Sequence, residues 1–142
     1  MTATESDRFW SKVEFDGWLG CWRWTACTIY SGYGQFKPSG QRRLAKSHRW
    51  AYENLVGPIP DGLELDHLCR NRACVNPGHL EPVTHRENLL RGDTQAGQNA
   101  RKTHCKNGHE FTPENTIRRP EGGRKCRTCA RAHKRAWKER NR

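Results

Sequence analysis

The sequence predicts a small α+β protein in which metal ligation supplements a modest apolar core. Short alternating apolar runs, bounded by glycine and proline, indicate short antiparallel strands. Between and after these runs, several segments have the apolar spacing and the flanking residues of helices. The 142 residues are only 33% hydrophobic, yet they include 6 Trp, 7 Cys and 7 His, which disordered basic chains rarely contain. We therefore expect a folded chain that does not depend on apolar burial alone.

Charge and cysteine content narrow the class of protein. Lys and Arg total 26 against 15 Asp and Glu, a net charge of +11, and this surplus suits a polyanionic partner such as nucleic acid. No run of 18 apolar residues predicts a membrane span, and the first residues lead into no apolar signal sequence, so we expect a cytoplasmic protein without a membrane partner. Seven cysteines cannot all pair as disulfides, and in a reducing compartment thiols near histidines favour metal ligation.

The first 60 residues predict an aromatic region of helices and a small sheet. A short helix is expected over residues 7–15, with its apolar side chains facing inward. The aromatic and glycine-punctuated segment 17–36 indicates a small antiparallel sheet. A second helix is expected over residues 47–55, where Trp50 shares one side with other apolar residues, and it stops at the Gly57-Pro58 pair.

The middle of the chain predicts a strand–loop–strand–helix unit. Strands are expected over residues 63–67 and 79–83, joined by a loop. Thr84 and Glu87 have the spacing of a capping box, so a helix is expected over residues 85–91. This motif, with the glycine that ends its helix, covers residues 63–92.

The last third of the chain is the more basic part. Residues 93–142 hold 14 of the 26 Lys and Arg but only 5 of the 15 acidic residues. The polar segment that opens this region has no large apolar side chain and predicts a linker, whereas alanine and long cations after Cys129 favour a helix. We therefore expect a domain at 1–92, a linker at 93–103 and a basic module at 104–142.

Four residues of that module have the spacing of a structural zinc site, namely Cys105, His109, Cys126 and Cys129. The two short-spaced pairs are separated by a gap that suits a hairpin, and four nitrogen and sulfur ligands close a tetrahedral site. His104 is the alternative nitrogen ligand, although it adjoins Cys105. A zinc ion here would help to fold a segment that is poor in apolar residues.

A second cluster contains three candidate zinc ligands, Cys69, Cys74 and His79. A structural zinc site needs a fourth ligand, and Cys21 is the candidate. The alternative is that Cys21 is a small buried apolar residue. Cys27 remains, and we expect it to be a packed free thiol. Two structural zinc ions per chain are the resulting prediction.

The strand–loop–strand–helix unit resembles the HNH nuclease family. The paired Asp66 and His67 and the later Asn88 match the order of that family's motif, and the cysteine-containing insert between the strands is similar to that of phage-type HNH endonucleases. Segments 20–24 and 48–49 extend the resemblance over most of the chain. It implies a ββα-metal fold with a C-terminal zinc-binding module, and a hydrolase that nicks or cleaves double-stranded DNA, in the host cytoplasm if a phage encodes it.

The resemblance also implies a role for each motif residue. Neutral imidazole suits the general base that activates water, which we assign to His67, so the rate should rise through about pH 6–7. Asp66 and Asn88 would hold one Mg²⁺, Mn²⁺ or similar ion through oxygen atoms, with His85 as the alternative to Asn88. At the middle position the family usually has asparagine, so His79 either braces the loop or binds zinc.

Five cations of the predicted C-terminal helix share one face at helical spacing, namely Arg127, Arg131, Lys134, Arg135 and Lys138. Phosphate contact is their expected use, and a solvated helix face is the alternative. Two other functions compete with the nuclease: a zinc-stabilised DNA-binding protein without catalysis, and an RNA-binding zinc module. The sequence leaves open the target site, the choice between nicking and double-strand cleavage, and the choice between homing and a packaging or other role. It also leaves open the oligomeric state, for which we favour a monomer.

Overall fold

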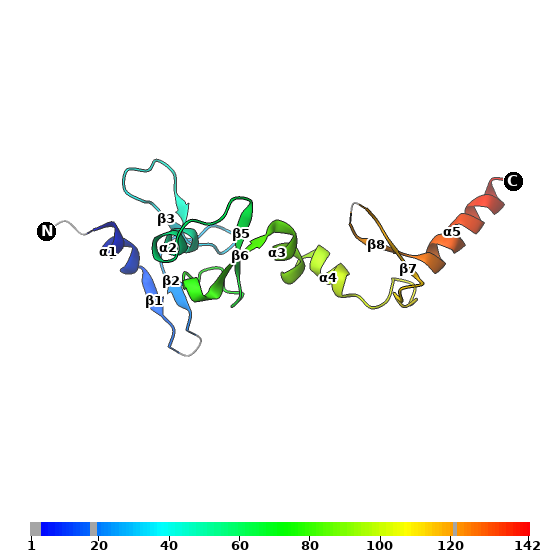
Figure 1. The fold of residues 1–142 in the computed structure, drawn as a ribbon, viewed down its shortest axis with the longest axis horizontal. Helices are drawn as coiled ribbons and strands as arrows, with labels where there is room; N and C mark the ends of the chain where they lie inside the picture. Colours follow the sequence, from blue (N-terminus) through cyan, green and yellow to red (C-terminus); the bar gives the residue numbers. More distant parts are fainter. Residues whose placement is uncertain (1–3, 18–19, 121) are drawn as a thin grey trace. The chain divides into compact units, whose positions relative to one another are not determined.

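The computed structural model consists of short strands and helices (Figure 1). It describes residues 4–17, 20–120 and 122–142. In these residues the strands form four two-stranded antiparallel sheets, which confirms the α+β prediction. The chain divides into two compact units, Met1–Asn88 and Leu89–Arg142. No helix among the described residues is long and apolar enough to cross a bilayer.

The first unit begins with six short elements. These are α1 (Glu5–Trp10), β1 (Val13–Phe15), β2 (Trp22–Trp24), β3 (Gln35–Phe36), β4 (Ala45–Lys46) and α2 (Ser47–Leu55). β1 pairs with β2, and β3 pairs with β4. The helix α2 has the predicted bounds. Trp18 and Leu19, in the segment expected to form a sheet, lie outside the described residues.

The helix expected over residues 7–15 was wrong in both bounds. Thr4 and Asp7 form a capping box, so the helix starts earlier. It ends at Trp10, because Val13–Phe15 pairs with Trp22–Trp24 across the chain reversal. Tertiary strand pairing thus overrides the local apolar spacing that suggested one continuous helix.

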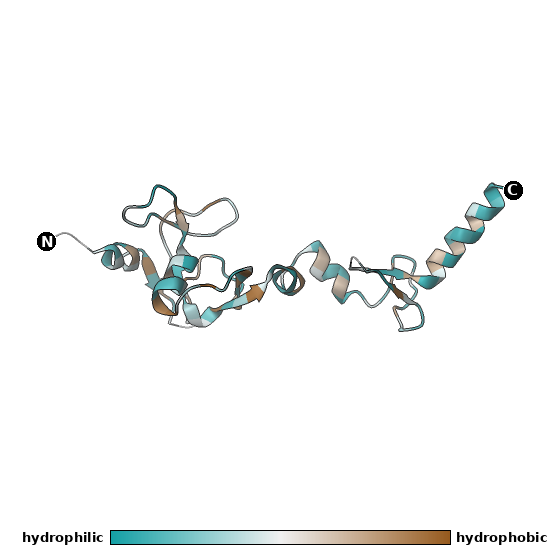
Figure 2. Ribbon diagram, turned by 45° about the horizontal axis from the view of Figure 1, so that its top comes forward, coloured by the Kyte–Doolittle hydropathy of each residue, from teal (hydrophilic) through white to brown (hydrophobic). Residues whose placement is uncertain are grey.

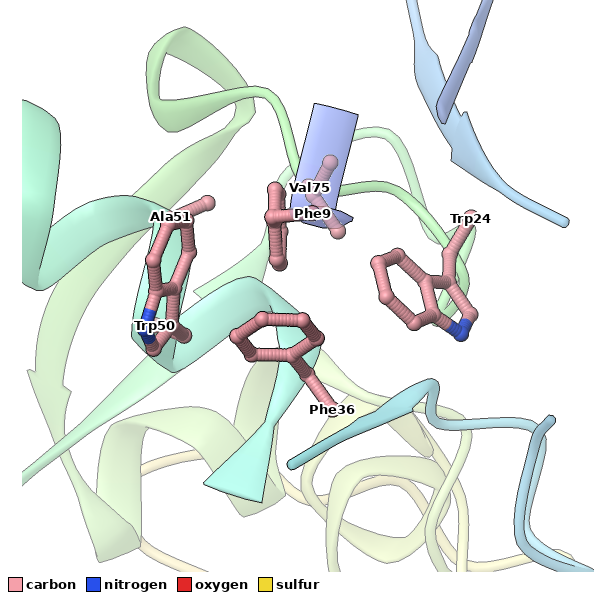
Figure 3. Packing of buried hydrophobic residues seen from close by; sticks show 6 residues of the cluster. All are labelled: Phe9, Trp24, Phe36, Trp50, Ala51 and Val75. Atoms are coloured by element: carbon pink, nitrogen blue, oxygen red, sulfur yellow. The ribbon is translucent and has the colours of Figure 1, made fainter. Parts of the chain in front are cut away.

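An aromatic cluster holds the first unit together, and Figure 3 shows Phe9 at its centre. The Phe9 ring is fully buried. It stacks on Trp50 at 4.1 Å between ring centroids and contacts Phe36 and Trp24 at 5.0 Å each. Val75 joins the same cluster from the loop after β5. Aromatic burial therefore anchors that loop to the helices and strands of this unit.

The predicted strand–loop–strand–helix unit is present. It consists of β5 (Leu63–His67), a 3₁₀ turn η1 (Pro77–His79), β6 (Leu80–Thr84) and α3 (His85–Arg91). β5 pairs with β6 from Leu63 opposite Thr84 to His67 opposite Leu80. The second strand starts one residue later than expected, because the η1 turn takes up His79. The capping box is present, since the Thr84 backbone N–H donates to the Glu87 carboxylate at 3.0 Å.

The second unit contains α4 (Gln95–Arg101), β7 (Thr116–Arg118), β8 (Arg124–Cys126) and α5 (Arg127–Arg140). Hydrophilic residues predominate along α5 (Figure 2). Within the segment expected to be a linker, residues 95–101 are helical. Thr94 caps this helix by accepting from the Gly97 N–H at 3.0 Å, and a Cβ at Gly97 would lie 2.5 Å from the Gly92 carbonyl oxygen. A glycine that suggests flexibility in the sequence is thus required here for close backbone packing.

Candidate active site and metal clusters

The strand β5 ends in the two residues that resemble the catalytic pair. The Asp66 side chain is 4% exposed and its Oδ1 accepts a 2.8 Å hydrogen bond from the Arg70 guanidinium. Arg70 is the last residue of a turn that is closed by a hydrogen bond from its N–H to the His67 carbonyl oxygen, and its φ is +57°. This left-handed conformation is rare outside glycine. The chain reverses sharply at this turn, so the Arg70 side chain reaches back to Asp66 at the end of the strand.

His67 is the last residue of β5, and its side chain is buried. Its Nε2 lies 3.1 Å from the carbonyl oxygen of Cys74. A carbonyl oxygen only accepts, so Nε2 carries the proton, and the lone pair of the neutral ring is on Nδ1. The loop after β5 therefore selects the tautomer in which Nδ1 can accept a proton.

The surroundings of His67 favour its neutral form. Burial lowers the pKa of His67 below the ordinary value of 6.5, and the charges of Arg72 and Arg70 act in the same direction. The Cys74 hydrogen bond and the Asp66 carboxylate oppose this by raising the pKa. Burial is the largest of these causes, so the neutral ring, which can accept a proton, is favoured at neutral pH.

A second buried histidine packs against His67. The His48 ring contacts the His67 ring at 4.7 Å between centroids, and Tyr33 lies against both rings. Burial is the largest cause that lowers the pKa of His48 to about 3, and the positive charges of Lys46 and Arg49 act in the same direction. His48 thus stays uncharged and fills space beside the candidate base. In the sequence, His48 belongs to segment 48–49, which is part of the resemblance to the HNH family, but no role was predicted for it.

The helix α3 brings Asn88 to the same strand face as Asp66. The Asn88 Nδ2 donates to Glu64 Oε2 at 2.8 Å, and Glu64 precedes Asp66 by two residues on β5. Residues i and i+2 of a strand point to one face, so Asn88 lies over the face that carries Asp66. A carboxylate and an amide oxygen are ligands that Mg²⁺ accepts, and the donor set fits such an ion.

Glu64 itself is a residue that the sequence reasoning missed. One oxygen of its carboxylate accepts a hydrogen bond from Asn88, and the other oxygen lies 2.9 Å from His85 Nδ1. The hydrogen bond from Asn88 and then that of His85 lower the pKa of Glu64. The His85 side chain is 68% exposed and is engaged with Glu64, whereas Asn88 is half-buried. Glu64 could have been identified from the sequence by its position two residues before Asp66, which places both residues on one face of the strand.

The four residues expected at one zinc site in the first unit come together. The ligand atoms of Cys21, Cys69, Cys74 and His79 all lie within 4.8 Å of one another. The His79 Nδ1 is 3.6 Å from the sulfur of Cys21 and 3.6 Å from that of Cys74. Burial raises the pKa of Cys74 to about 12, so a cation is needed to hold the thiolate there. The cluster could hold one tetrahedral zinc ion.

Backbone pairing explains how distant Cys21 reaches the loop. Cys21 directly precedes β2, and the loop after β5 docks on that strand through hydrogen bonds from Trp24 N–H to the Ala73 carbonyl and from Val75 N–H to the Trp22 carbonyl, each 2.8 Å. Bracing of this loop is done by Asn76. Its amide donates to the Gly20 carbonyl at 2.7 Å and accepts from the Gly78 N–H at 2.9 Å.

The four residues expected at the second zinc site also converge. The ligand atoms of Cys105, His109, Cys126 and Cys129 lie within 4.8 Å of one another, and His104 is not among them. The Cys105 sulfur is 3.7 Å from that of Cys129, and the Cys129 sulfur is 3.3 Å from His109 Nδ1. The β7–β8 hairpin ends at Cys126, where the Cys129 N–H hydrogen bond lowers the pKa of the thiol to about 7. This cluster too could hold one zinc ion.

Cys27, the remaining cysteine, is exposed. The expectation of a packed thiol was therefore wrong. Cys27 lies just before the bridge between Thr28 and Gly34, where its backbone carbonyl accepts from Trp24 Nε1 at 3.1 Å and from the Gln35 N–H. The backbone carbonyl of Cys27 is thus hydrogen-bonded, while its side chain is exposed.

The basic helix α5 presents a cationic surface. Arg131, Lys134, Arg135 and Lys138 line one open depression together with Thr128. Arg127 Nε donates to the Glu114 carbonyl at 2.7 Å, next to the hairpin. The depression thus contains four of the five cations that the sequence spacing predicted on one face, and Arg127 is not among its lining residues.

Comparison with known proteins places these features in context. Residues 45–90, which include Asp66, His67 and Asn88, match the family model described as HNH endonuclease. The matched residues contain β5, β6 and most of α3. No solved structure matches the chain.

Three curated phage proteins are similar to parts of the chain. The uncharacterized gene 5.3 protein of Enterobacteria phage T3 is 42% identical over 52 residues, covering 37% of this chain and 52% of that protein. Protein 7.7 of Escherichia phage T7 is 37% identical over 68 residues, covering 48% and 51%. Protein 2.8 of the same phage is 36% identical over 69 residues, covering 49% and 46%. The chain thus spans about half the length of the curated relatives it matches.

Proposed function

We propose that the chain is a metal-dependent HNH endonuclease that nicks or cleaves double-stranded DNA by phosphodiester hydrolysis, and the match of residues 45–90 to the HNH endonuclease family model supports this. One observation carries the proposal: a buried His67, held by the Cys74 carbonyl in the tautomer of a base, directly follows Asp66 on the strand that Asn88 faces. We place its action in the cytoplasm of a bacterial host, because its relatives are phage proteins.

His67 would perform the proton transfer. Its Nδ1 takes a proton from a water molecule as the water oxygen attacks phosphorus, the bond to the leaving oxygen breaks, and solvent returns a proton to that oxygen. Asp66 and Asn88 would hold one divalent ion, which when bound supplies positive charge to the phosphate and the leaving oxygen. The Cys74 carbonyl stabilises the imidazolium that forms on His67, because Nε2–H continues to donate to it.

The proposed structural role of zinc follows from the chemistry of the two clusters. Each cluster consists of three thiols and one imidazole nitrogen, the donor set of closed tetrahedral zinc sites. Zinc in the first unit would fix the loop whose Cys74 carbonyl orients His67. Zinc in the second unit would tie the hairpin to the start of α5. We propose residues 1–92 as the catalytic domain and 104–142 as a DNA-contacting module.

A plasmid assay tests the proposed activity. Zinc-loaded protein is mixed with supercoiled plasmid, with and without added Mg²⁺ or Mn²⁺, and the open-circular and linear products are quantified. Cleavage that depends on the added ion supports the proposal. Plasmid binding without cleavage at any concentration of either ion would instead favour a non-catalytic zinc-stabilised DNA-binding protein. Exclusive cleavage or binding of RNA would overturn the choice of DNA.

The pH dependence of cleavage tests the state of His67. Protonated His67 cannot accept a proton, so the single-turnover rate should rise as pH increases through the pKa and then level off. Because burial lowers the pKa of His67 below 6.5, we expect the midpoint below that value and a plateau by pH 7. The measurement is the cleavage rate at saturating Mn²⁺ between about pH 5 and 8. A midpoint above 6.5, or a rate independent of pH, would contradict this role.

The contribution of α5 is tested through salt dependence. Replacing Arg131 and Lys138 together with alanine is expected to weaken DNA binding and to lower the slope of log K against log[salt] by roughly 2, about 0.9 for each lost phosphate contact. The control is the double substitution Arg8→Ala and Arg23→Ala, since these side chains are already engaged with Ser39 and Glu14. Equal slopes for the two double variants would remove α5 from the DNA interface.

A further inference from the structure

An asparagine that binds a cation must be oriented. Its amide group has two ends of similar shape, but only the oxygen is an acceptor, and the NH₂ end repels a positive ion. Rotation of the amide by half a turn exchanges the two ends at little steric cost. If Asn88 holds a cation beside Asp66, some neighbour must determine which end of the amide faces that cation.

Glu64 supplies this orientation. An ionised carboxylate accepts hydrogen bonds and cannot donate them, so the amide end that lies 2.8 Å from Glu64 Oε2 must be Nδ2. The Asn88 oxygen therefore points away from Glu64. A glutamate carboxyl group is ionised at neutral pH, so both of its oxygens act as acceptors here.

A second contact holds Glu64 itself. Its other oxygen, Oε1, is 2.9 Å from His85 Nδ1 on the same helix as Asn88. The carboxylate is thus fixed between two side chains of α3 that are three residues apart, and it reaches them from the strand face that also carries Asp66. Glu64 thus belongs to β5 and is held by two side chains of α3, so it connects the strand with the helix of the ββα unit.

We infer that Glu64 is a positioning residue, which fixes the Asn88 amide so that its oxygen is presented to the divalent ion beside Asp66. The inference rests on the proposed function of Asp66 and Asn88. Glu64 acts only through Asn88 and is not itself assigned as a ligand. Outer-shell partners of this kind typically change metal affinity by about 10- to 100-fold when they are removed.

The test compares Glu64→Ala in two backgrounds, the natural sequence and the Asn88→Asp variant. The carboxylate that Asn88→Asp introduces has two equivalent oxygens and needs no orienting partner. We expect Glu64→Ala to weaken Mn²⁺ binding by about 10-fold or more in the natural background, and not to weaken it in the Asn88→Asp background. Mn²⁺ affinity is measured by electron paramagnetic resonance on zinc-loaded protein without DNA, so the readout is independent of activity.

Two other roles of Glu64 give a different pattern. If Glu64 merely attracted the ion by its charge, or merely supported the fold, Glu64→Ala would weaken Mn²⁺ binding in both backgrounds, and this result would overturn the inference. Glu53→Ala is the matched control, since it removes an equal charge from α2, where Glu53 faces Arg49, and it should leave the affinity unchanged. An unchanged affinity for Glu64→Ala in the natural background would also overturn the inference.

Failure of the proposed function is distinguishable from failure of this inference. Asn88→Ala should weaken Mn²⁺ binding if Asn88 is a ligand. If Asn88→Ala binds Mn²⁺ as tightly as the unchanged protein, the assignment of Asn88 fails, and the inference fails with it. If Asn88→Ala weakens binding and Glu64→Ala does not, only the positioning role of Glu64 is wrong.

Discussion

Replacing His67 with alanine is expected to lower the single-turnover rate of DNA cleavage by about 10²- to 10⁴-fold, the usual contribution of a positioned general base. The substitution removes the Nδ1 lone pair that accepts the proton of the attacking water. It leaves Asp66 and Asn88 in place, and it does not alter the cations of α5. DNA affinity, measured by fluorescence anisotropy, should therefore stay close to that of the unchanged protein.

The matching control is His104→Ala. His104 is exposed and lies outside both cysteine clusters, so its removal should leave cleavage intact. Alanine at position 67 also leaves a cavity beside His48 and Tyr33, and thermal unfolding would report any loss of stability. A His67→Ala protein that is folded, binds DNA and still cleaves at the original rate would show that His67 is not the base.

Loss of zinc from the second unit is the other change with a large expected effect. Replacing Cys126 with serine removes a proposed zinc ligand, a buried thiol at the junction of β8 and α5. Structural zinc contributes about 10–16 kcal/mol of apparent binding energy in zinc-finger peptides, far more than a unit with so few buried apolar residues can replace. We therefore expect residues 89–142 to unfold and DNA affinity to fall sharply.

Metal analysis by mass spectrometry checks this directly. The unchanged protein should contain about two zinc ions per chain, and Cys126→Ser about one, because each cluster has the four ligand residues that one tetrahedral site requires. Cys27→Ser is the control: this cysteine is exposed and belongs to neither cluster, so it should retain both ions. No zinc in the unchanged protein would remove both sites, and two ions in Cys126→Ser would remove this ligand assignment.

Elements with strong local signals could be predicted closely from the sequence. The helix at Ser47–Leu55, the strand at Leu63–His67 and the helix at His85–Arg91 have the expected bounds. Capping residues and Gly or Pro breakers act within a few residues of an element's end, so they can be identified without tertiary information. The short spacings within the cysteine and histidine pairs are local signals of the same kind.

Features that depend on distant partners could not be predicted in this way. The first helix ends early because Val13–Phe15 finds a partner strand, and residues 95–101 form a helix that packs back on the Gly92 carbonyl. Cys27 faces outward although its type favours burial. For the first helix, a strand partner elsewhere in the chain outweighs the local propensity, whereas the helix at residues 95–101 has a local cap, Thr94, that the sequence reasoning missed.

The same division holds for the candidate site. By itself the sequence determined the residue types of the proposed chemistry: a histidine beside an aspartate, an asparagine on the next helix, and two sets of cysteines and a histidine that could bind zinc. Only the tertiary structure decided the tautomer of His67, through the Cys74 carbonyl, and the orientation of Asn88, through Glu64. Residue identity follows from the chain, but the direction in which a hydrogen-bonding atom points depends on its partner, and these partners come from other elements of the fold.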